Sequence, residues 1–286
     1  MLATLIPLIS ALGGAIATSI SKALVDRIGA RQLTVLTFVG VAVIMAPFAP
    51  LFFHVEQLAV FVPFFLLIIA TDAVGNLLFF TALSGEDVSK VTALAAMSPL
   101  FTAILAPLLL PAHFGPGVFI ATIAIVLSLY VIETGELVDP VNDLQRRETL
   151  YVLVSAMLFG FSAIPMRYLL TEWSLVNAPT LYWLRGIAIA AVLLAVLRPD
   201  FSHIDRRTYG IIGFKCVFVV SQWVLMLYAL ARFNVITTKA LSQFIPVFVF
   251  FIATEELGEA FNLHRLVGIL LIVASTVAIH VLGLAV

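Results

Sequence analysis

An acidic residue near the middle of a long apolar run is the first candidate for chemistry. Asp72 lies within the run from Leu58 to Leu83, and Asn76 follows four residues later, on the same face if the run is helical. Within a bilayer, an ionisable side chain at this depth costs at least about 2.5 to 3.5 kcal/mol. Two interpretations are open: a cavity residue that binds substrate or a coupling proton, and a structural hydrogen bond or ion pair between helices.

A second group of polar side chains lies in the run 208–231. Lys215 comes early in this run, and Gln222 lies seven residues later, beside Trp223 and before Tyr228. A glutamine and two aromatic rings on an apolar helix suit a cavity wall that stacks on, or hydrogen-bonds, a small organic molecule. The same residues could instead serve helix packing and interfacial anchoring.

Other candidates are polar or charged side chains, and prolines, placed within or beside apolar runs. Pro99 and Pro246 are predicted to kink their helices, which frees carbonyl groups for a cavity. Arg185 could contact an anion or pair with a carboxylate, and Glu259 is expected to cap the helix that follows it. The predicted substrate-binding residues are Asp72, Asn76, Ser98, Ser162, Gln222, Trp223, Tyr228 and Gln243.

Composition places these residues in a membrane protein. Of 286 residues, 63% are hydrophobic and 11% are charged, and the mean hydropathy is +1.17, far from the composition of a soluble domain. Apolar runs of about 20 residues, each long enough to cross a bilayer as a helix, recur along the chain. They predict an all-α protein with about ten spans: 2–24, 33–53, 57–83, 90–111, 114–133, 149–170, 177–198, 208–231, 237–255 and 262–284.

Two further counts exclude other classes of protein. The net charge of −1 argues against a nucleic-acid partner. The single cysteine, Cys216, excludes a disulfide framework and a cysteine-based metal site, and its apolar surroundings indicate a packing role.

The chain contains an internal repeat. The stretch 82–101 recurs without a gap as 229–248, with Ala-Leu, Asp/Asn-Val, a second Ala-Leu and Pro-x-Phe in register. We therefore predict a five-helix repeat over 1–135, a linker over 136–148 and a second five-helix repeat over 149–286. Because five is odd, the two repeats would lie in opposite orientations, as inverted repeats of secondary transporters do.

This inversion suggests a partner for Asp72. The run that holds Lys215 is the counterpart of the run that holds Asp72 and would lie antiparallel to it, which brings both side chains to the same side of the midplane. We therefore expect an ion pair between Asp72 and Lys215. The alternative is that Lys215 extends alone to the membrane interface.

Basic residues predict an orientation. About ten lysines and arginines fall in or beside odd-numbered loops and about three in even-numbered loops, so the positive-inside rule places both termini outside the cell.

These features resemble the EamA-like members of the drug/metabolite transporter superfamily. The resemblance rests on Pro99-Leu100-Phe101 and Pro246-Val247-Phe248, on Gly258-Glu259 with Gly268 in the next span, and on Arg185 early in the second helix of a half. It covers nearly the whole chain and implies a ten-helix transporter. The first half departs from the pattern, with Ala112 at the position of Glu259 and Thr37 at that of Arg185. Family members usually have cytoplasmic termini, which disagrees with the charge count, and the orientation stays open.

The expected function is secondary transport. We predict an exporter of small metabolites, such as amino acids or related solutes, that works by alternating access around a midplane cavity and is driven by a proton or by exchange. A membrane channel or a lipid flippase is the alternative. An intramembrane enzyme is least favoured, because the five histidines are scattered and no acidic pair has helical spacing within a span. The expected partners are the substrate and the lipid bilayer, with no cofactor, metal or nucleic acid, in the plasma membrane of a prokaryotic cell.

Overall fold

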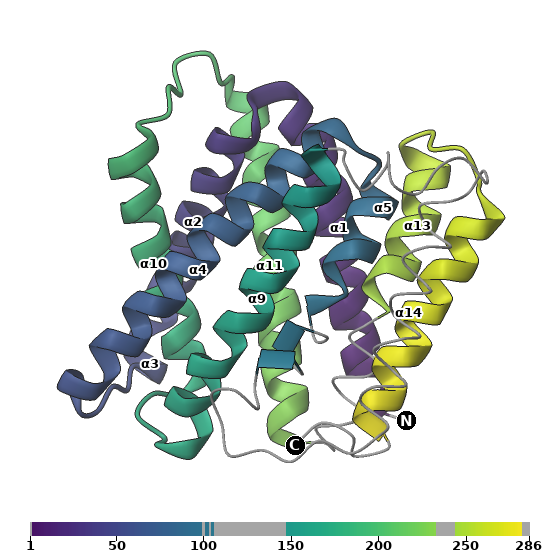
Figure 1. Cartoon of the computed structure of the whole chain (residues 1–286). Coiled ribbons are helices and arrows are strands. Elements are labelled where there is room, and N and C mark those ends of the chain that lie inside the picture. Colours follow the sequence, from purple (N-terminus) through teal and green to yellow (C-terminus); the bar gives the residue numbers. More distant parts are fainter. Residues whose placement is uncertain (1, 99–100, 103, 106–146, 233–243, 282–286) are drawn as a thin grey trace.

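The computed structural model describes residues 2–98, 101–102, 104–105, 147–232 and 244–281 as a bundle of helices (Figure 1). The first half contains α1 (Leu2–Ile28), α2 (Ala30–Met45), the short η1 (Ala46–Phe48) and α3 (Ala49–Phe52), α4 (Leu58–Gly85) and α5 (Val88–Ala95). The second half contains α9 (Arg147–Arg167), η2 (Tyr168–Glu172), α10 (Ala178–Leu197), α11 (Arg206–Arg232), α13 (Ile245–Glu256) and α14 (Leu263–Val281).

Six of the described helices are long and apolar enough to cross a membrane. The part of the chain that the structure describes is helical, as predicted, and these six helices coincide with the predicted spans that begin at residues 2, 33, 57, 149, 177 and 208. The predicted span 114–133 lies outside the described residues, as do Pro99, Gln243 and most of the linker, so the count of ten helices stays a prediction.

Local signals determine where several helices begin and end. The Asn177 side chain accepts a hydrogen bond from the backbone N–H of Thr180 at 2.9 Å and so caps α10. That helix ends at Arg198, whose backbone is left-handed (φ 43°). The first turn of α9 carries Glu148, which suits the positive end of a helix dipole. The first two described residues of α9, Arg147 and Glu148, belong to the predicted linker.

The helices of the two halves interlock in symmetric pairs. Helix α1 packs on α11, and its counterpart α9 packs on α4; α1 also contacts α13, and α9 contacts α5. Helices α2 and α10, which occupy matching places in the two halves, pack on each other. Exchange of the two halves therefore preserves these contacts.

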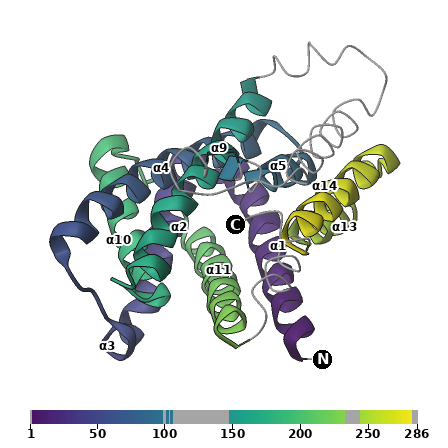
Figure 2. The ribbon, with the colours of Figure 1, turned by 60° about the horizontal axis from the view of Figure 1, so that its bottom comes forward.

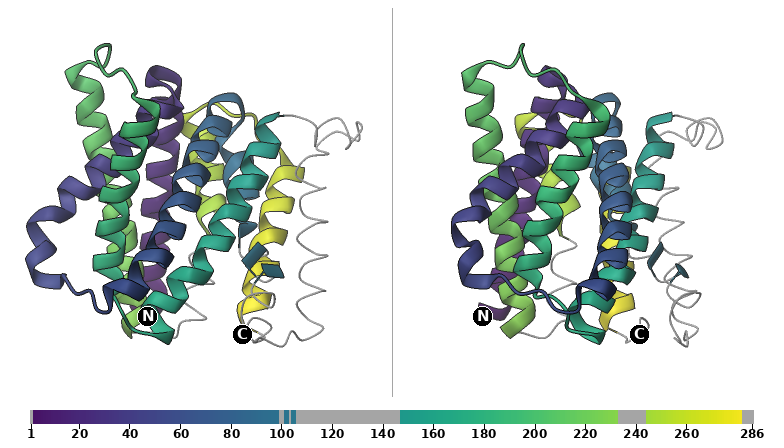
Figure 3. Two further views of the ribbon diagram at one scale, coloured as in Figure 1. Left: turned by 60° about the vertical axis from the view of Figure 1, so that its left-hand side comes forward. Right: turned by 90° about the vertical axis from the view of Figure 1, so that its left-hand side faces the viewer.

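Matching helices run in opposite directions. Figure 3 shows α1 starting at the lower end of the molecule and α9 starting at the upper end. At the upper end, the Lys22 ammonium donates to the Leu83 carbonyl at 2.9 Å, which places the ends of α1 and α4 together. At the lower end, Val55 and Val176 form an antiparallel bridge between the loops that precede α4 and α10.

The halves also share one hydrophobic core. Its largest cluster combines Leu24 and Leu83 of the first half with Val152 and Phe250 of the second. Figure 2 shows α13 and α14 side by side next to α1 and α5, so the last two helices are packed against the first half. Burial of these apolar side chains therefore holds the two halves together.

Close helix contacts depend on small side chains. Cys216 of α11 is buried against Gly40 of α2, where an added Cβ would lie 2.5 Å from the cysteine sulfur. This contact supports a packing role for Cys216. On α9, Gly160 faces the segment after α5, and a Cβ there would lie 2.5 Å from the Ser98 carbonyl oxygen and 2.9 Å from the Thr102 nitrogen.

We expect Gly160→Ala to lower the free energy of unfolding by about 1 to 3 kcal/mol, because the new methyl group meets backbone atoms that cannot rotate away. Thermal unfolding of the purified protein in detergent measures the change. Gly213→Ala on α11 is the matched control, since no atom lies within 4 Å of its added Cβ. Equal melting temperatures for the two variants would contradict the tight contact at Gly160.

Candidate functional site

A cavity of about 440 Å³ lies between the two halves. Its wall takes residues from α1, α2, α4 and α5 and from α9, α11 and α13. The aromatic part of the wall consists of Phe79, Phe80, Phe159 and Trp223. The hydroxyl and amide groups along it belong to Ser10, Thr18, Ser21, Thr37, Asn76, Thr92, Ser98 and Gln222, and Lys215 is the charged residue among the described lining residues. The volume is that of a pocket for a small organic molecule.

The structure brings part of the predicted site together. Asn76, Ser98, Gln222 and Trp223 all line the cavity, as does Pro246 at the start of α13. Tyr228 does not, because it lies further along α11 and is 47% exposed. Asp72 and Ser162 lie outside the cavity wall, and both are buried.

Asp72 forms an ion pair with Arg185, which corrects the expected pairing with Lys215. The carboxylate oxygen Oδ2 lies 2.8 Å from the Arg185 Nε, and Asp72 is only 1% exposed. The N–H is not aimed along this contact, so charge rather than an aligned hydrogen bond joins the two groups. Ser162 of α9 lies beside the carboxylate. The carboxylate partner that the sequence left open for Arg185 is thus Asp72.

The expected pair of Asp72 and Lys215 was wrong because the helices that carry these residues pack on different neighbours. Helix α4, which carries Asp72, packs on α9 and α10, whereas α11, which carries Lys215, packs on α1 and α2. Because α4 and α11 are related by the inverted repeat, the sequence predicts the depth of their residues along the membrane normal. It does not place them side by side.

The Arg185 guanidinium connects this ion pair to the cavity wall. Its central carbon lies 5.9 Å from the ring centre of Tyr182 and 5.8 Å from that of Trp223. The two rings stack on each other with centroids 5.1 Å apart. Since Trp223 also faces the cavity, the Asp72–Arg185 pair lies directly behind the wall.

Lys215 lies at the corresponding interface of the repeat, between α11 and α2. Its ammonium donates to the Thr37 hydroxyl at 2.5 Å, and the Thr37 hydroxyl in turn donates to the Leu33 carbonyl at 2.7 Å. The ammonium also lies 4.7 Å from the ring centre of Phe80. This contact joins α11 to α2, as Asp72–Arg185 joins α4 to α10. One of these two interfaces therefore has an ion pair where the other has a lysine and a threonine.

Comparison with known families follows the same division of the chain. The model of the EamA-like transporter family matches it twice, over residues 1–134 and 146–281. The chain belongs to the EamA-like transporter family. It is thus an integral membrane transporter of the drug/metabolite superfamily with two EamA-like repeats, as the resemblance implied.

The chain was also compared with individual curated proteins and with solved structures. A search of curated proteins gives no match. A solved crystal structure is similar to this EamA-like chain with a TM-score of 0.62 and 17% sequence identity, and the similarity covers 98% of each chain. Identity this low supports the fold alone.

Glu259, part of the EamA-like Gly-Glu motif, caps a different helix from the one expected. Its Oε1 accepts from the backbone N–H of Val88 at 2.6 Å, and its Oε2 accepts from the Ser89 hydroxyl at 2.5 Å, both at the start of α5. Helix α14 is capped instead by Asn262, whose Oδ1 accepts from the backbone N–H of Arg265 at 3.1 Å. The sequence motif identified a capping residue but not its partner, which belongs to the other half.

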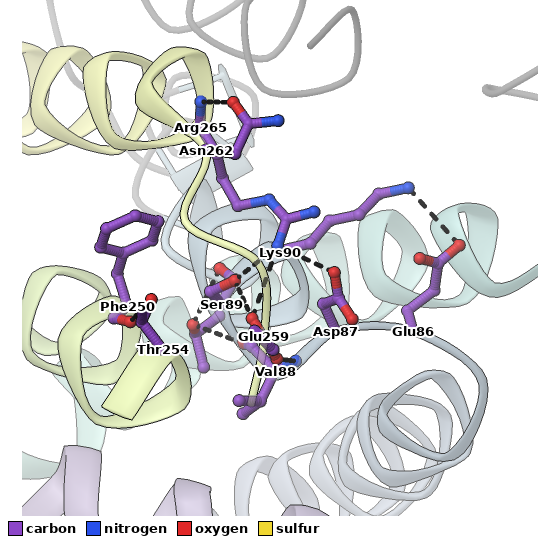
Figure 4. Close-up of polar contacts among 11 residues, drawn as sticks. Glu86, Asp87, Val88, Ser89, Lys90, Phe250, Thr254, Glu259, Asn262 and Arg265 are labelled. Atoms are coloured by element: carbon purple, nitrogen blue, oxygen red, sulfur yellow. Dashed lines mark hydrogen bonds and ion pairs between the residues drawn. The ribbon is translucent and has the colours of Figure 1, made fainter. Parts of the chain in front are cut away.

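Arg265 completes this contact between the halves (Figure 4). Its Nη1 lies 2.8 Å from Asp87, 3.0 Å from the Ser89 hydroxyl and 3.4 Å from Glu259. Figure 4 shows the guanidinium reaching from α14 across to the first turn of α5. We call Asp87, Ser89, Glu259 and Arg265 the upper cluster, because they join the two repeats at the upper end of the molecule.

Proposed function

We propose that this EamA-like protein is a secondary transporter that exports small metabolites, such as amino acids or related solutes, across the plasma membrane of a prokaryotic cell. Transport would occur by alternating access of the central cavity to the two sides of the membrane, coupled to a proton or to an exchanged solute. The observation that carries the proposal is a cavity whose wall comes from both repeats. Relative movement of the repeats would then change its access.

The composition of the cavity supports a small organic substrate. Aromatic rings can stack on an apolar body, while the hydroxyl groups and the amides of Asn76 and Gln222 can orient its polar groups. Asp72 stays a candidate for proton coupling through its contact with Arg185, which touches Trp223 in the wall. The upper cluster supports the same mechanism, since it is a polar contact between the repeats that a relative movement of the repeats would rearrange.

Counterflow in liposomes tests this function. Purified protein is reconstituted into vesicles loaded with one unlabelled amino acid at high concentration, and uptake of the same labelled solute is followed across a panel. We expect a transient, saturable accumulation of one solute above equilibrium, because a carrier exchanges solutes through one binding site. Protein-free vesicles are the control. Uptake that rises linearly with concentration and shows no counterflow would indicate a channel instead.

A further inference from the structure

The chemistry of the cavity suggests which end of a substrate it recognises. Lys215 is 1% exposed, yet it is one of the residues that line the cavity, and its ammonium contacts two other lining residues, Thr37 and Phe80. Among the residues that the structure describes, no carboxylate lies within ion-pair distance of this ammonium, and none of the lining residues is acidic. Among the described lining residues, Lys215 is therefore the one that brings a charge to the cavity.

The groups that do touch Lys215 compensate its charge only in part. The Thr37 hydroxyl accepts one of its three N–H donors, and the Phe80 ring offers a cation–π contact. Burying an ammonium group without a counter-ion is costly, whereas a hydrogen bond to a charged group contributes about 1.5 to 3 kcal/mol. An anion inside the cavity would reach the remaining donors.

The corresponding interface between α4 and α10 shows how the protein compensates a buried charge with its own residues. There, Arg185 has Asp72 as its counter-ion at 2.8 Å. Lys215 has Thr37 at the equivalent interface and an open cavity beside it. The interface that lacks a carboxylate is thus the one whose cation belongs to a residue of the cavity wall.

We propose that Lys215, held in position by Thr37, binds the carboxylate group of an organic substrate, whose apolar body lies against Phe79, Phe80, Phe159 and Trp223. This inference rests on the proposed transport function and names the substrate class for the same cavity. The substrate needs a carboxylate and does not need an ammonium group, because no described lining residue offers a counter-ion to a cation. A monocarboxylate with an aromatic or branched apolar body fits these requirements.

The test uses pairs of probes that share an apolar body and differ in the head group and its charge. Pairs of aromatic and branched aliphatic compounds, such as 3-phenylpropanoate with 3-phenylpropylamine and 4-methylpentanoate with its amide, are titrated against the purified protein in detergent. Quenching of tryptophan fluorescence reports binding, since Trp223 lines the cavity. We expect the carboxylates to bind and the matched amines and amides to bind at least tenfold more weakly.

Variants assign the effect to Lys215. Lys215→Met should weaken carboxylate binding by about 10- to 100-fold while the protein stays folded, because methionine suits a buried apolar position. Thr37→Val should weaken it by a smaller factor. Arg206→Met removes one positive charge from the exposed start of α11 and should leave binding unchanged.

The outcomes separate this inference from the transport function. Unchanged carboxylate binding by Lys215→Met, or preferential binding of the amines or amides, would overturn it. Absence of binding by every carboxylate, in a protein that still shows counterflow of another solute, would overturn it as well and leave the transporter standing. A wild-type protein that shows no counterflow with any solute of the panel would instead count against the proposed function.

Discussion

Asp72→Asn is expected to lower the free energy of unfolding by about 3 to 5 kcal/mol, the largest effect that we predict for a single substitution. The change removes the counter-ion of Arg185 and leaves a guanidinium buried without compensation. The melting temperature in detergent should fall accordingly. Asp26→Asn is the matched control, because Asp26 is 51% exposed in a 3.6 Å ion pair with Lys22 and such pairs contribute little.

A paired substitution distinguishes an ion-pair role from a role in coupling. If Asp72 mainly neutralises Arg185, the double variant Asp72→Leu with Arg185→Met should recover most of the lost stability, since apolar residues often replace a buried pair at little cost. A variant Asp72→Asn that melts like the wild type but has lost counterflow would contradict this structural role. It would then point to proton coupling at Asp72.

Glu259→Ala should lower the free energy of unfolding by about 2 to 3 kcal/mol. The alanine leaves the backbone N–H of Val88 without its acceptor and removes one of the carboxylates that contact Arg265. Thermal unfolding measures the loss, and Glu256→Ala, at an exposed position three residues earlier, is the control.

Glu259→Gln separates the two contributions. A glutamine oxygen can still accept the bond from Val88, so this variant should keep the cap on α5 and lose only the charge that faces Arg265. We therefore expect it to lie between the wild type and Glu259→Ala. If Glu259→Ala and Glu256→Ala have the same melting temperature, the upper cluster does not stabilise this conformation.

The upper cluster and the Asp72–Arg185 pair have one feature in common: each joins a residue of the first half to a residue of the second. Asp72 lies on α4 and Arg185 on α10, while Glu259 follows α13 and Val88 begins α5. Both substitutions therefore weaken contacts between the repeats rather than one repeat alone. The alternating access proposed above would rearrange contacts between the repeats, so we expect the stability of these two to bear on transport as well.

Much of the architecture could be predicted from the sequence, because its signals are local. A run of apolar residues such as Leu58 to Leu83 has to form its hydrogen bonds internally within a bilayer, which makes it a helix whatever its neighbours are. Asn177 caps a helix through a bond three residues away. The repeat of 82–101 at 229–248 indicated two related halves, which the two family matches confirm. Polar residues in apolar runs, such as Gln222, were for the same reason visible as candidates for the cavity.

Partners across the interface were decided by the tertiary structure alone. The sequence placed Asp72 and Lys215 at related depths, but only the packing of α4 on α10 and of α11 on α2 determines that Asp72 meets Arg185 and that Lys215 meets Thr37. Likewise, the motif at Glu259 predicted a cap, and the approach of α5 determined which helix receives it. The physical reason is that an ion pair or a cap acts over a few ångströms, whereas periodicity and hydropathy specify a residue's face and depth but not the helix beside it.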